Sequence, residues 1–294
     1  MDDVARPLAT AGSRAALART IEEYLRAAPA DPSALATEVI RLAEQLAEGM
    51  DVERRVHREI AIAREVQQRL LPQRAPELPH AELAASCIQA RSVGGDYYDF
   101  LDLGPGRVGL VLADVSGKGV HAALRMANLQ AHLRSQAGSA PHDPLRVLRL
   151  VNHMLLESTQ PGDFATLFFG VYADATRRLT YINCGHNPPA CLRRDGSVEW
   201  LGATATVLGA FEPWECSLGR LQLGAGDLLV AYSDGVTEAS RGVEQFGEER
   251  LIETLRSRAD ASPERVVSAI LERVQEFSGG SQSDDLTLLV ARVR

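Results

Sequence analysis

The sequence predicts an α+β domain built of layered antiparallel sheets and preceded by a helical segment. Up to residue 72, apolar residues recur at helical steps of three and four, and beyond residue 80 they alternate as in strands. The expected strands come in hairpin-like groups and the expected helices in pairs, which argues against alternating βαβ units. With 45% apolar and 24% charged residues, the chain can bury a core and is neither mainly disordered nor fibrous.

The first 80 residues are expected to be helical. A short helix is predicted at about residues 14–27 and a long one over about 33–71, because Asp31-Pro32 supplies an N-cap and a first-turn proline and Leu71-Pro72 ends the pattern. The apolar stripe of the long helix comprises Leu35, Val39, Leu42, Leu46, Val52, Val56, Ile60, Ala63 and Leu70. This stripe suits a coiled-coil seam between two chains and a helix packed on its own domain equally well. Pro76 and Pro79 mark a linker, so we place a domain boundary near residue 80.

The remaining segment, 81–294, is expected to form the layered domain. Strands are predicted at 82–90, 95–103 and 107–115, where Val108, Leu110 and Leu112 form a buried run. Helices follow at 119–136 and 143–159, separated by a turn at 138–144. Further strands are expected at 164–173, 178–184, 189–193, 215–223 and 227–233, then helices at 247–259 and 263–277 and a last strand at 286–293.

Composition excludes several classes of protein. The net charge is −8 and is not segregated along the chain, which argues against nucleic-acid binding. No stretch approaches the roughly 20 apolar residues of a membrane span and no signal-peptide pattern is present, so a cytoplasmic protein is expected. The four cysteines lack C-x-x-C spacing, which argues against structural zinc and favours reduced, mostly buried thiols; they are Cys87, Cys184, Cys191 and Cys216.

Aspartates beside glycine occur at four predicted strand ends or turns. The motifs are G-G-D-Y-Y-D at 94–99, D-V-S-G-K-G at 114–119, S-D-G-V at 233–236 and D-D-L-T at 284–287. Any one of these aspartates is explained as a turn residue. A converging set of carboxylates, however, repels itself unless cations neutralise it. Hard oxygen donors without His or Cys partners indicate Mg²⁺ or Mn²⁺.

Taken in order, and with N-C-G-H-N-P-P at 183–189 between them, these motifs resemble the PPM-type metal-dependent serine/threonine protein phosphatases, in particular their SpoIIE/RsbU branch. The resemblance covers about residues 60–294 and includes A-R-E-V-Q-Q-R-L-L-P at 63–72, which is similar to the helix that precedes the catalytic domain in this branch. It implies a layered α-β-β-α sandwich, with two antiparallel sheets flanked by helix pairs. It also implies that residues 1–80 are a regulatory and dimerisation segment and residues 81–294 the phosphatase domain.

The resemblance assigns roles to particular residues. It implies two divalent cations, Mn²⁺ or Mg²⁺, with Asp114 as the ligand that bridges them. The implied ligands are Asp96, Asp114, the main-chain carbonyl of Val115, Asp234 and Asp284. Among these, Asp96, Asp114 and Asp234 are implied to be catalytic. Asp99 and Asp285 are additional candidates. Two cations close together would lower the pKa of a bridging water and offset the charge of a phosphoryl group, so direct hydrolysis without a phospho-enzyme is implied.

Other residues leave alternatives open. No histidine follows Asp114 as it does in the eukaryotic branch, so leaving-group protonation has no obvious side-chain donor. Arg91 precedes Asp96 by five residues, which is the family's offset for a phosphate-binding arginine, but it also suits a solvated side chain. Lys118, the one lysine beside 30 arginines, could contact substrate phosphate or be a solvated loop residue. For His186 a turn histidine bound to backbone is favoured over a catalytic base.

The expected function is removal of phosphate from Ser or Thr of a bacterial regulatory protein. The branch resemblance implies a phosphorylated STAS-type anti-anti-sigma factor as substrate, in a partner-switching pathway. The long helix is expected to mediate homodimerisation and to dock near the 119–136 helix, so that an upstream activator binding the N-terminal helices alters the metal site. Two alternatives stand beside this hypothesis: a catalytically silent phosphatase-like binding module, and a phosphatase for small phosphate esters.

Overall fold

The computed structural model describes residues 32–294. The chain divides into two compact units, Met1–Ala63 and Arg64–Arg294. Helix α2 (Pro32–Leu70) matches the long helix expected at 33–71, whereas the short helix expected at 14–27 lies outside the described residues. None of the helices in the described part combines the length and the apolar character needed to cross a bilayer. The assignment of residues 1–80 as a regulatory segment stays a prediction.

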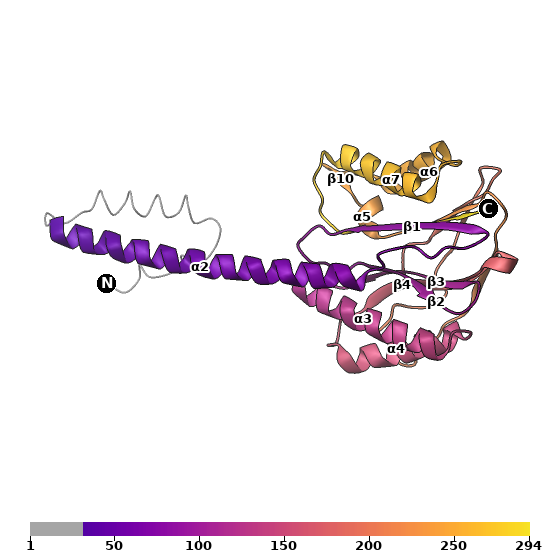
Figure 1. Cartoon of the computed structure of the whole chain (residues 1–294), viewed down its shortest axis with the longest axis horizontal. Helices are drawn as coiled ribbons and strands as arrows, with labels where there is room; N and C mark the ends of the chain where they lie inside the picture. Colours follow the sequence, from indigo (N-terminus) through magenta and orange to yellow (C-terminus); the bar gives the residue numbers. More distant parts are fainter. Residues whose placement is uncertain (1–31) are drawn as a thin grey trace. The chain divides into compact units, whose positions relative to one another are not determined.

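Two five-stranded sheets form the body of the second unit (Figure 1). The first sheet has the order β1 (Ala81–Ile88), β12 (Leu286–Val293), β9 (Leu228–Tyr232), β6 (Ala190–Leu192) and β7 (Val198–Trp200). The second has the order β2 (Tyr97–Asp102), β3 (Arg107–Val115), β4 (Ala165–Ala173), β5 (Arg178–Cys184) and β8 (Gly219–Gln222). Every pairing within these sheets is antiparallel, as predicted.

A pair of helices covers the outer face of each sheet, which confirms the α-β-β-α sandwich (Figure 1). Helices α3 (Val120–Ser139) and α4 (Pro144–Ser158) pack on the second sheet, and α6 (Gly247–Ser257) and α7 (Pro263–Ser278) on the first. The start of α4 follows from its sequence, since the Asp143 side chain accepts a hydrogen bond from the Arg146 N–H and Pro144 occupies the first turn.

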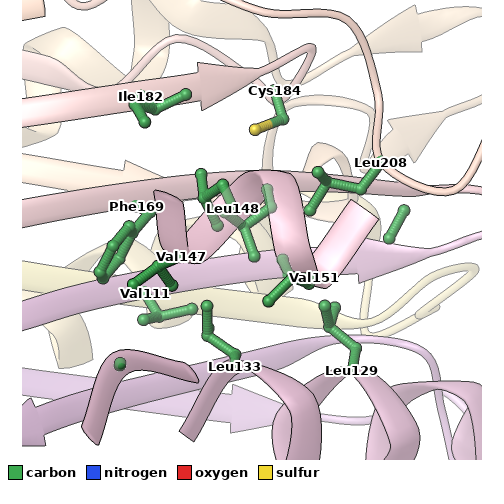
Figure 2. Packing of buried hydrophobic residues seen from close by; sticks show 14 of the residues in the cluster. Val111, Leu129, Leu133, Val147, Leu148, Val151, Phe169, Ile182, Cys184 and Leu208 are labelled. Carbon is green, nitrogen blue, oxygen red and sulfur yellow. The ribbon is translucent and has the colours of Figure 1, made fainter. Parts of the chain in front are cut away.

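Apolar side chains fill the three interfaces between the four layers. Beneath α3 and α4, Leu129 and Leu148 meet Val111, Phe169 and Ile182 of the second sheet (Figure 2). Two further clusters lie between the sheets and beneath α6 and α7. Each fully buried Leu, Val or Phe contributes about 1.5–3 kcal/mol. This packing fixes the positions of the strands whose ends carry the aspartate motifs of the sequence.

The short elements were not predicted. They are β7, the 3₁₀ turn Asp174–Thr176, α5 (Asp234–Thr237), β10 (Ser240–Arg241) and β11 (Glu244–Gln245). Elements of two to four residues are too short to show a period. The strand predicted at 215–223 is shorter than expected, because Cys216 forms only an isolated bridge with Ala205 before β8 begins at Gly219.

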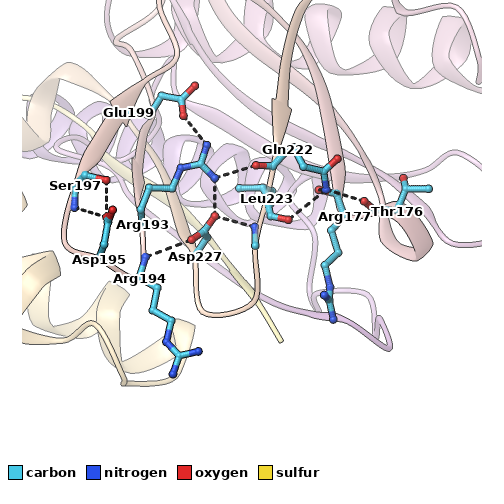
Figure 3. Close-up of polar contacts among 11 residues, drawn as sticks. Thr176, Arg177, Arg193, Arg194, Asp195, Ser197, Glu199, Gln222, Leu223 and Asp227 are labelled. Carbon is cyan, nitrogen blue, oxygen red and sulfur yellow. Dashed lines mark hydrogen bonds and ion pairs between the residues drawn. The ribbon is translucent and has the colours of Figure 1, made fainter.

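Polar contacts close the end of the sandwich around β6 and β8 (Figure 3). The buried Asp227 carboxylate accepts hydrogen bonds from the Arg193 guanidinium at 2.6 Å and the Gly224 N–H at 2.8 Å. Arg193 also pairs with Glu199 at 2.5 Å. The Gln222 side chain donates to the Thr176 carbonyl at 2.9 Å and thereby fastens the 174–177 turn to β8. Each buried charge in this network therefore has a partner.

Candidate metal centre

The sheet topology brings the aspartate motifs to one end of the sandwich. Asp114 is the next-to-last residue of β3, and Asp96 lies just before its antiparallel neighbour β2. Asp234 directly follows β9, and Asp284 lies just before the antiparallel neighbour β12. The carboxylates of Asp96, Asp234 and Asp284 each interact electrostatically with Asp114. Four motifs that are up to 190 residues apart in sequence thus form one site.

Burial and mutual repulsion disfavour ionisation in this group. Burial, followed by the Asp114 charge, raises the pKa of Asp96 well above its usual range. Burial, followed by the charges of Asp234 and Asp284, raises the pKa of Asp114 to about 7. Asp96 is 2% exposed, and its Oδ2 has no hydrogen-bond partner among the described residues. Without a cation, the site therefore holds more negative charge than its surroundings neutralise.

These residues fit divalent metal ions by the chemistry of their donors. Carboxylate oxygens, one of them buried and unpartnered, are the ligands that Mg²⁺ and Mn²⁺ prefer. Across residues 32–294, no three acidic, histidine or cysteine side chains are gathered tightly enough to hold an ion as they stand. One cause is visible, because the Lys118 Nζ lies 2.7 Å from Asp284 Oδ2 and supplies a counter-charge. A cation bound at Asp284 would therefore compete with the Lys118 ammonium group.

Three glycines let the backbone approach the site closely. A Cβ on Gly95 would lie 2.6 Å from the Val115 carbonyl oxygen, the main-chain ligand that the family resemblance implies. A Cβ on Gly94 would lie 1.9 Å from Asp285 Oδ2, and one on Gly235 would lie 2.1 Å from the Asp285 carbonyl oxygen. Any side chain at these positions forces the chain apart. The glycines beside the aspartates are therefore required by contact, not only by turn geometry.

Gly95→Ala is expected to weaken Mn²⁺ binding at least about tenfold, because the new methyl group displaces the Val115 carbonyl oxygen. Calorimetric titration of the purified variant with Mn²⁺ measures this effect. Gly138→Ala is the matched control, since a Cβ there meets nothing within 4 Å. Equal Mn²⁺ affinity in Gly95→Ala and wild type would contradict a ligand role for this carbonyl.

Asp285 organises the loop in front of the site. Its Oδ1 accepts a hydrogen bond from the Ala90 N–H at 2.8 Å, and its Oδ2 accepts from the Gly95 and Asp96 N–H groups at 3.1 and 3.4 Å. Its main-chain carbonyl accepts from the Ser233 hydroxyl at 3.1 Å. Asp285, in the fourth motif, therefore connects the first motif with the third, and its carboxylate is occupied by backbone donors.

Asp99 lies apart from the other carboxylates. It is fully buried and accepts two hydrogen bonds from Arg134 of α3, at 2.7 and 2.9 Å, and another from the Tyr97 hydroxyl. Side chains alternate across a strand, so a residue three positions after Asp96 faces the other side. Asp99 therefore has a structural role: its contact with Arg134 joins β2 to α3.

The two basic candidates lie at the entrance of the site. Lys118 is about half exposed, and the hydrogen bond that it donates to Asp284 raises its pKa, an effect that the nearby Arg91 charge opposes. Arg91 is exposed on the loop before Gly94. Lys118 is thus paired with a carboxylate, and Arg91 lies close enough to Lys118 for its charge to act on it.

Lys118→Met is expected to tighten Mn²⁺ binding several-fold, since it removes a tethered cation that competes for Asp284. Lys118→Arg keeps the charge and should stay near wild-type affinity. Calorimetric titration with Mn²⁺ at low salt compares the three proteins. Weaker Mn²⁺ binding in Lys118→Met would contradict competition between the ammonium group and the metal.

His186, Cys184 and Cys191 are buried, whereas Cys87 and Cys216 are partly exposed. The His186 Nδ1 lies 2.8 Å from the Thr166 hydroxyl, and burial lowers the pKa of the ring to about 4. The ring thus contacts a hydroxyl group as well as the backbone of Tyr232, and it is neutral at pH 7. All four cysteines are free, and burial raises the pKa of Cys191 to about 12, which leaves it inert as a nucleophile.

Two functional contacts could not be anticipated. The buried Gln67 side chain of α2 donates to the Gly94 carbonyl at 2.8 Å and accepts from the Gly94 N–H at 3.2 Å. Arg125 of α3 donates to the Ser116 carbonyl at 3.1 Å and pairs with Asp163 at 2.6 Å. The first holds the loop that carries Asp96, and the second holds the loop that follows Asp114. Gln67 lies in the quoted 63–72 motif, whereas Arg125 carries no signal in the sequence.

Comparisons with known proteins identify the family of this chain. A family model described as Stage II sporulation protein E (SpoIIE) matches residues 104–294. Protein IcfG of Synechocystis sp. is 33% identical over 260 residues, which cover 79% of this chain and 41% of IcfG. Phosphoserine phosphatase RsbU of Bacillus subtilis is 28% identical over 242 residues, which cover 82% of this chain and 72% of RsbU. The chain therefore spans less than half of IcfG.

Solved structures show the same architecture. The RsbU and RsbW domains of Rv1364c from Mycobacterium tuberculosis match with a TM-score of 0.65 at 30% identity, over 74% of this chain and 61% of that chain. The SiaA-PP2C domain of Pseudomonas aeruginosa matches in fold with a TM-score of 0.73 at 18% identity, over 82% of this chain and 98% of that chain. From its motifs, its sandwich and a family model that covers well over half of its length, the chain belongs to the SpoIIE family and carries a PP2C-type phosphatase domain.

Proposed function

We propose that the chain is a metal-dependent serine/threonine protein phosphatase that uses two Mn²⁺ or Mg²⁺ ions. The observation that carries the proposal is the convergence of Asp96, Asp114, Asp234 and Asp284 at one end of the sandwich, with an unpartnered buried oxygen on Asp96. Such a set of carboxylates suits cations and a phosphate substrate better than any chemistry of the buried histidine and cysteines.

In this proposal the chain's own residues hold and neutralise the reacting groups. The cations would be held by the carboxylates of Asp96, Asp114, Asp234 and Asp284 and by the main-chain carbonyl of Val115, with Asp114 shared between them. When bound, the cations would acidify a water molecule and offset the negative charge of the phosphoryl group. Asp285, Gln67 and Arg125 keep the ligand-bearing loops in place through their backbone hydrogen bonds. Most of the rate gain comes from this preorganisation.

Lys118 neutralises Asp284 in the structure, and a cation held by that carboxylate would compete with the ammonium group. Lys118 and Arg91, whose charge acts on it, would then be available to contact a substrate phosphate. His186 takes no part in protonating the leaving group, because it is buried and neutral.

The proposed substrate is a phosphorylated STAS-type anti-anti-sigma factor of a partner-switching pathway. Its support is the likeness to a phosphoserine phosphatase named RsbU, 28% identical, and to a structure that joins RsbU and RsbW domains. The test is release of phosphate from a phosphoserine-bearing STAS protein, compared with a phosphoserine peptide and an aryl phosphate, with and without Mn²⁺. A preference for the STAS protein supports the proposal. Equal or better turnover of small esters would contradict it, and binding without turnover would identify a silent binding module.

We also propose that α2 forms a homodimer and transmits an upstream activator's signal to the site. In the single chain Val52 is 60% exposed and Val56 is 46% exposed, as residues of an unpaired seam would be. The end of α2 touches the catalytic unit through Gln67 on Gly94 and through its Leu70 carbonyl, which accepts from Gln130 of α3 at 3.1 Å. Deletion of residues 1–59 should reduce the mass in solution and change the activity. Unchanged mass and activity would contradict this role.

The cytoplasm is the proposed compartment. Its support is that all four cysteines are free thiols, as in a reducing environment. Cell fractionation with an antibody against the protein tests it, and recovery from an oxidising compartment would contradict it.

A further inference from the structure

The second sheet carries a cavity at the end opposite to Asp114, which we call the arginine pocket. Its volume is about 480 Å³. Its basic and polar lining consists of Arg107, His142, Thr176, Arg178, Thr180 and Arg220. None of the described residues that line it is acidic. Strand β3 runs seven residues from Arg107 to Asp114, about 23 Å at 3.3 Å per residue, so this pocket is separate from the metal centre.

Strand register creates the arginine pocket. Ala173 of β4 pairs with Arg107 on one side and with Arg178 on the other, and Thr180 pairs with Arg220. Residues paired across antiparallel strands point to the same face, so the three arginines surround the small Ala173. The face is the one covered by α3 and α4, and the turn between these helices, with Pro141, forms a wall of the pocket. The helices end there and leave this part of the sheet open.

The charge of the arginine pocket is not neutralised by the protein. None of the three arginines forms an ion pair with a carboxylate of residues 32–294, whereas Arg193 nearby pairs with both Asp227 and Glu199 (Figure 3). The two aspartates adjacent in sequence to its lining are engaged elsewhere. Asp143 caps α4, and Asp174 binds His80 at 2.9 Å.

His142 adds a neutral donor to these charges. Arg107 Nη1 lies 2.5 Å from His142 Nδ1, and because arginine only donates, this nitrogen accepts and the ring hydrogen resides on Nε2. Three guanidinium groups and one imidazole thus share a cavity without a counter-ion. Like charges at such spacing favour the binding of an anion.

We propose that the arginine pocket binds the phosphate groups of a nucleoside diphosphate or triphosphate. Three arginines match an anion of about three charges, and their planar forks bind phosphate oxygens in pairs. The cavity lies within the roughly 300–1,000 Å³ of small-molecule sites, and it has more room than a single phosphate needs. Apolar walls from Pro141 and Leu218 suit the nucleoside. The proposal does not depend on the phosphatase activity.

Calorimetric titration tests this proposal with the full chain in EDTA, so that the metal centre cannot hold the phosphates. ATP, GTP, inorganic triphosphate and inorganic phosphate are the probes. The variant is the double substitution Arg178→Gln/Arg220→Gln, and Arg265→Gln, which changes an exposed arginine of α7, is the control. We expect saturable binding of at least one nucleotide to wild type and to the control, weakened at least about tenfold in the double variant. Circular dichroism checks that the double variant is folded.

Four results would overturn the proposal. The first is no saturable nucleotide binding to wild type, and the second is equal binding to the double variant, which would locate the ligand elsewhere. The third is binding of inorganic triphosphate as tight as that of both nucleotides, which would reduce the site to one for phosphate chains. If inorganic phosphate alone saturates the pocket more tightly than any nucleotide, the assignment to a nucleotide also fails.

Discussion

Asp114→Asn is expected to abolish phosphatase activity and at the same time to stabilise the metal-free protein. Activity should fall at least about 10³-fold, because the bridging carboxylate holds both proposed cations. Stability should rise because the substitution removes a charge that burial and the Asp234 and Asp284 carboxylates oppose. Opposite effects on activity and stability distinguish a functional carboxylate from a structural one.

The sign and the pH range of this stabilisation follow from linkage. The pKa of Asp114 in the folded protein is raised to about 7, above the value of roughly 4 in an unfolded chain. The folded protein therefore loses stability as the pH rises from about 4 to about 7, and the full penalty is present above pH 7. Asp114→Asn should stabilise the protein by roughly 1–3 kcal/mol at pH 8 and by little at pH 4.

Thermal unfolding in EDTA at pH 8 and pH 5, together with phosphate release in Mn²⁺, measures both effects. Asp260→Asn is the control, since it changes an exposed aspartate outside the site. A variant that retains activity would contradict the bridging role. A melting temperature lower than that of wild type at pH 8 would contradict the repulsion within the site.

The second large effect is expected for Arg134→Met, which should lower the free energy of unfolding by about 3–5 kcal/mol. Asp99 is fully buried, and both of its oxygens accept from Arg134. Loss of the guanidinium leaves a buried carboxylate without its counter-charge. Urea unfolding with and without Mn²⁺ measures the loss.

The double variant Asp99→Asn/Arg134→Met should recover much of this stability, because it removes the buried charge together with its partner. Arg69→Met is the matched control. It breaks the exposed Arg69–Glu65 pair of α2, which is worth about 0–1 kcal/mol. If Arg134→Met costs no more than this control, the Asp99 carboxylate is not held by Arg134 as the structure indicates.

The long elements of the fold follow from sequence periodicity, and the short ones do not. Strand β3 and helix α7 each repeat their apolar residues long enough to define a period. The four residues of α5 and the two of β10 do not, although α5 begins with Asp234. The layered order of the sandwich came from the family resemblance and not from these local patterns.

The residues of the candidate site were likewise predictable from the sequence only in part. Asp96 and Asp234 stand out because Gly95 and Gly235 adjoin them, and the close contacts at these glycines explain that pattern physically. Asp114 and Asp284 have no adjacent glycine and stand out through the order of the four motifs. The contacts between Lys118 and Asp284, Gln67 and Gly94, and Arg134 and Asp99 join residues 27 to 166 positions apart. Such contacts depend on strand order and helix placement, so a local motif does not reveal them. The arginine pocket depends on strand register for the same reason.

The central claim is that the four converging aspartates form a cation-dependent phosphatase centre. Its most direct test is the release of phosphate from a phosphoserine peptide by wild type and by Asp234→Asn, first in EDTA and then after addition of Mn²⁺. We predict that wild type is inactive in EDTA and active in Mn²⁺, and that Asp234→Asn is inactive in both. Hydrolysis by wild type that persists in EDTA, or by Asp234→Asn at the wild-type rate, would contradict the claim.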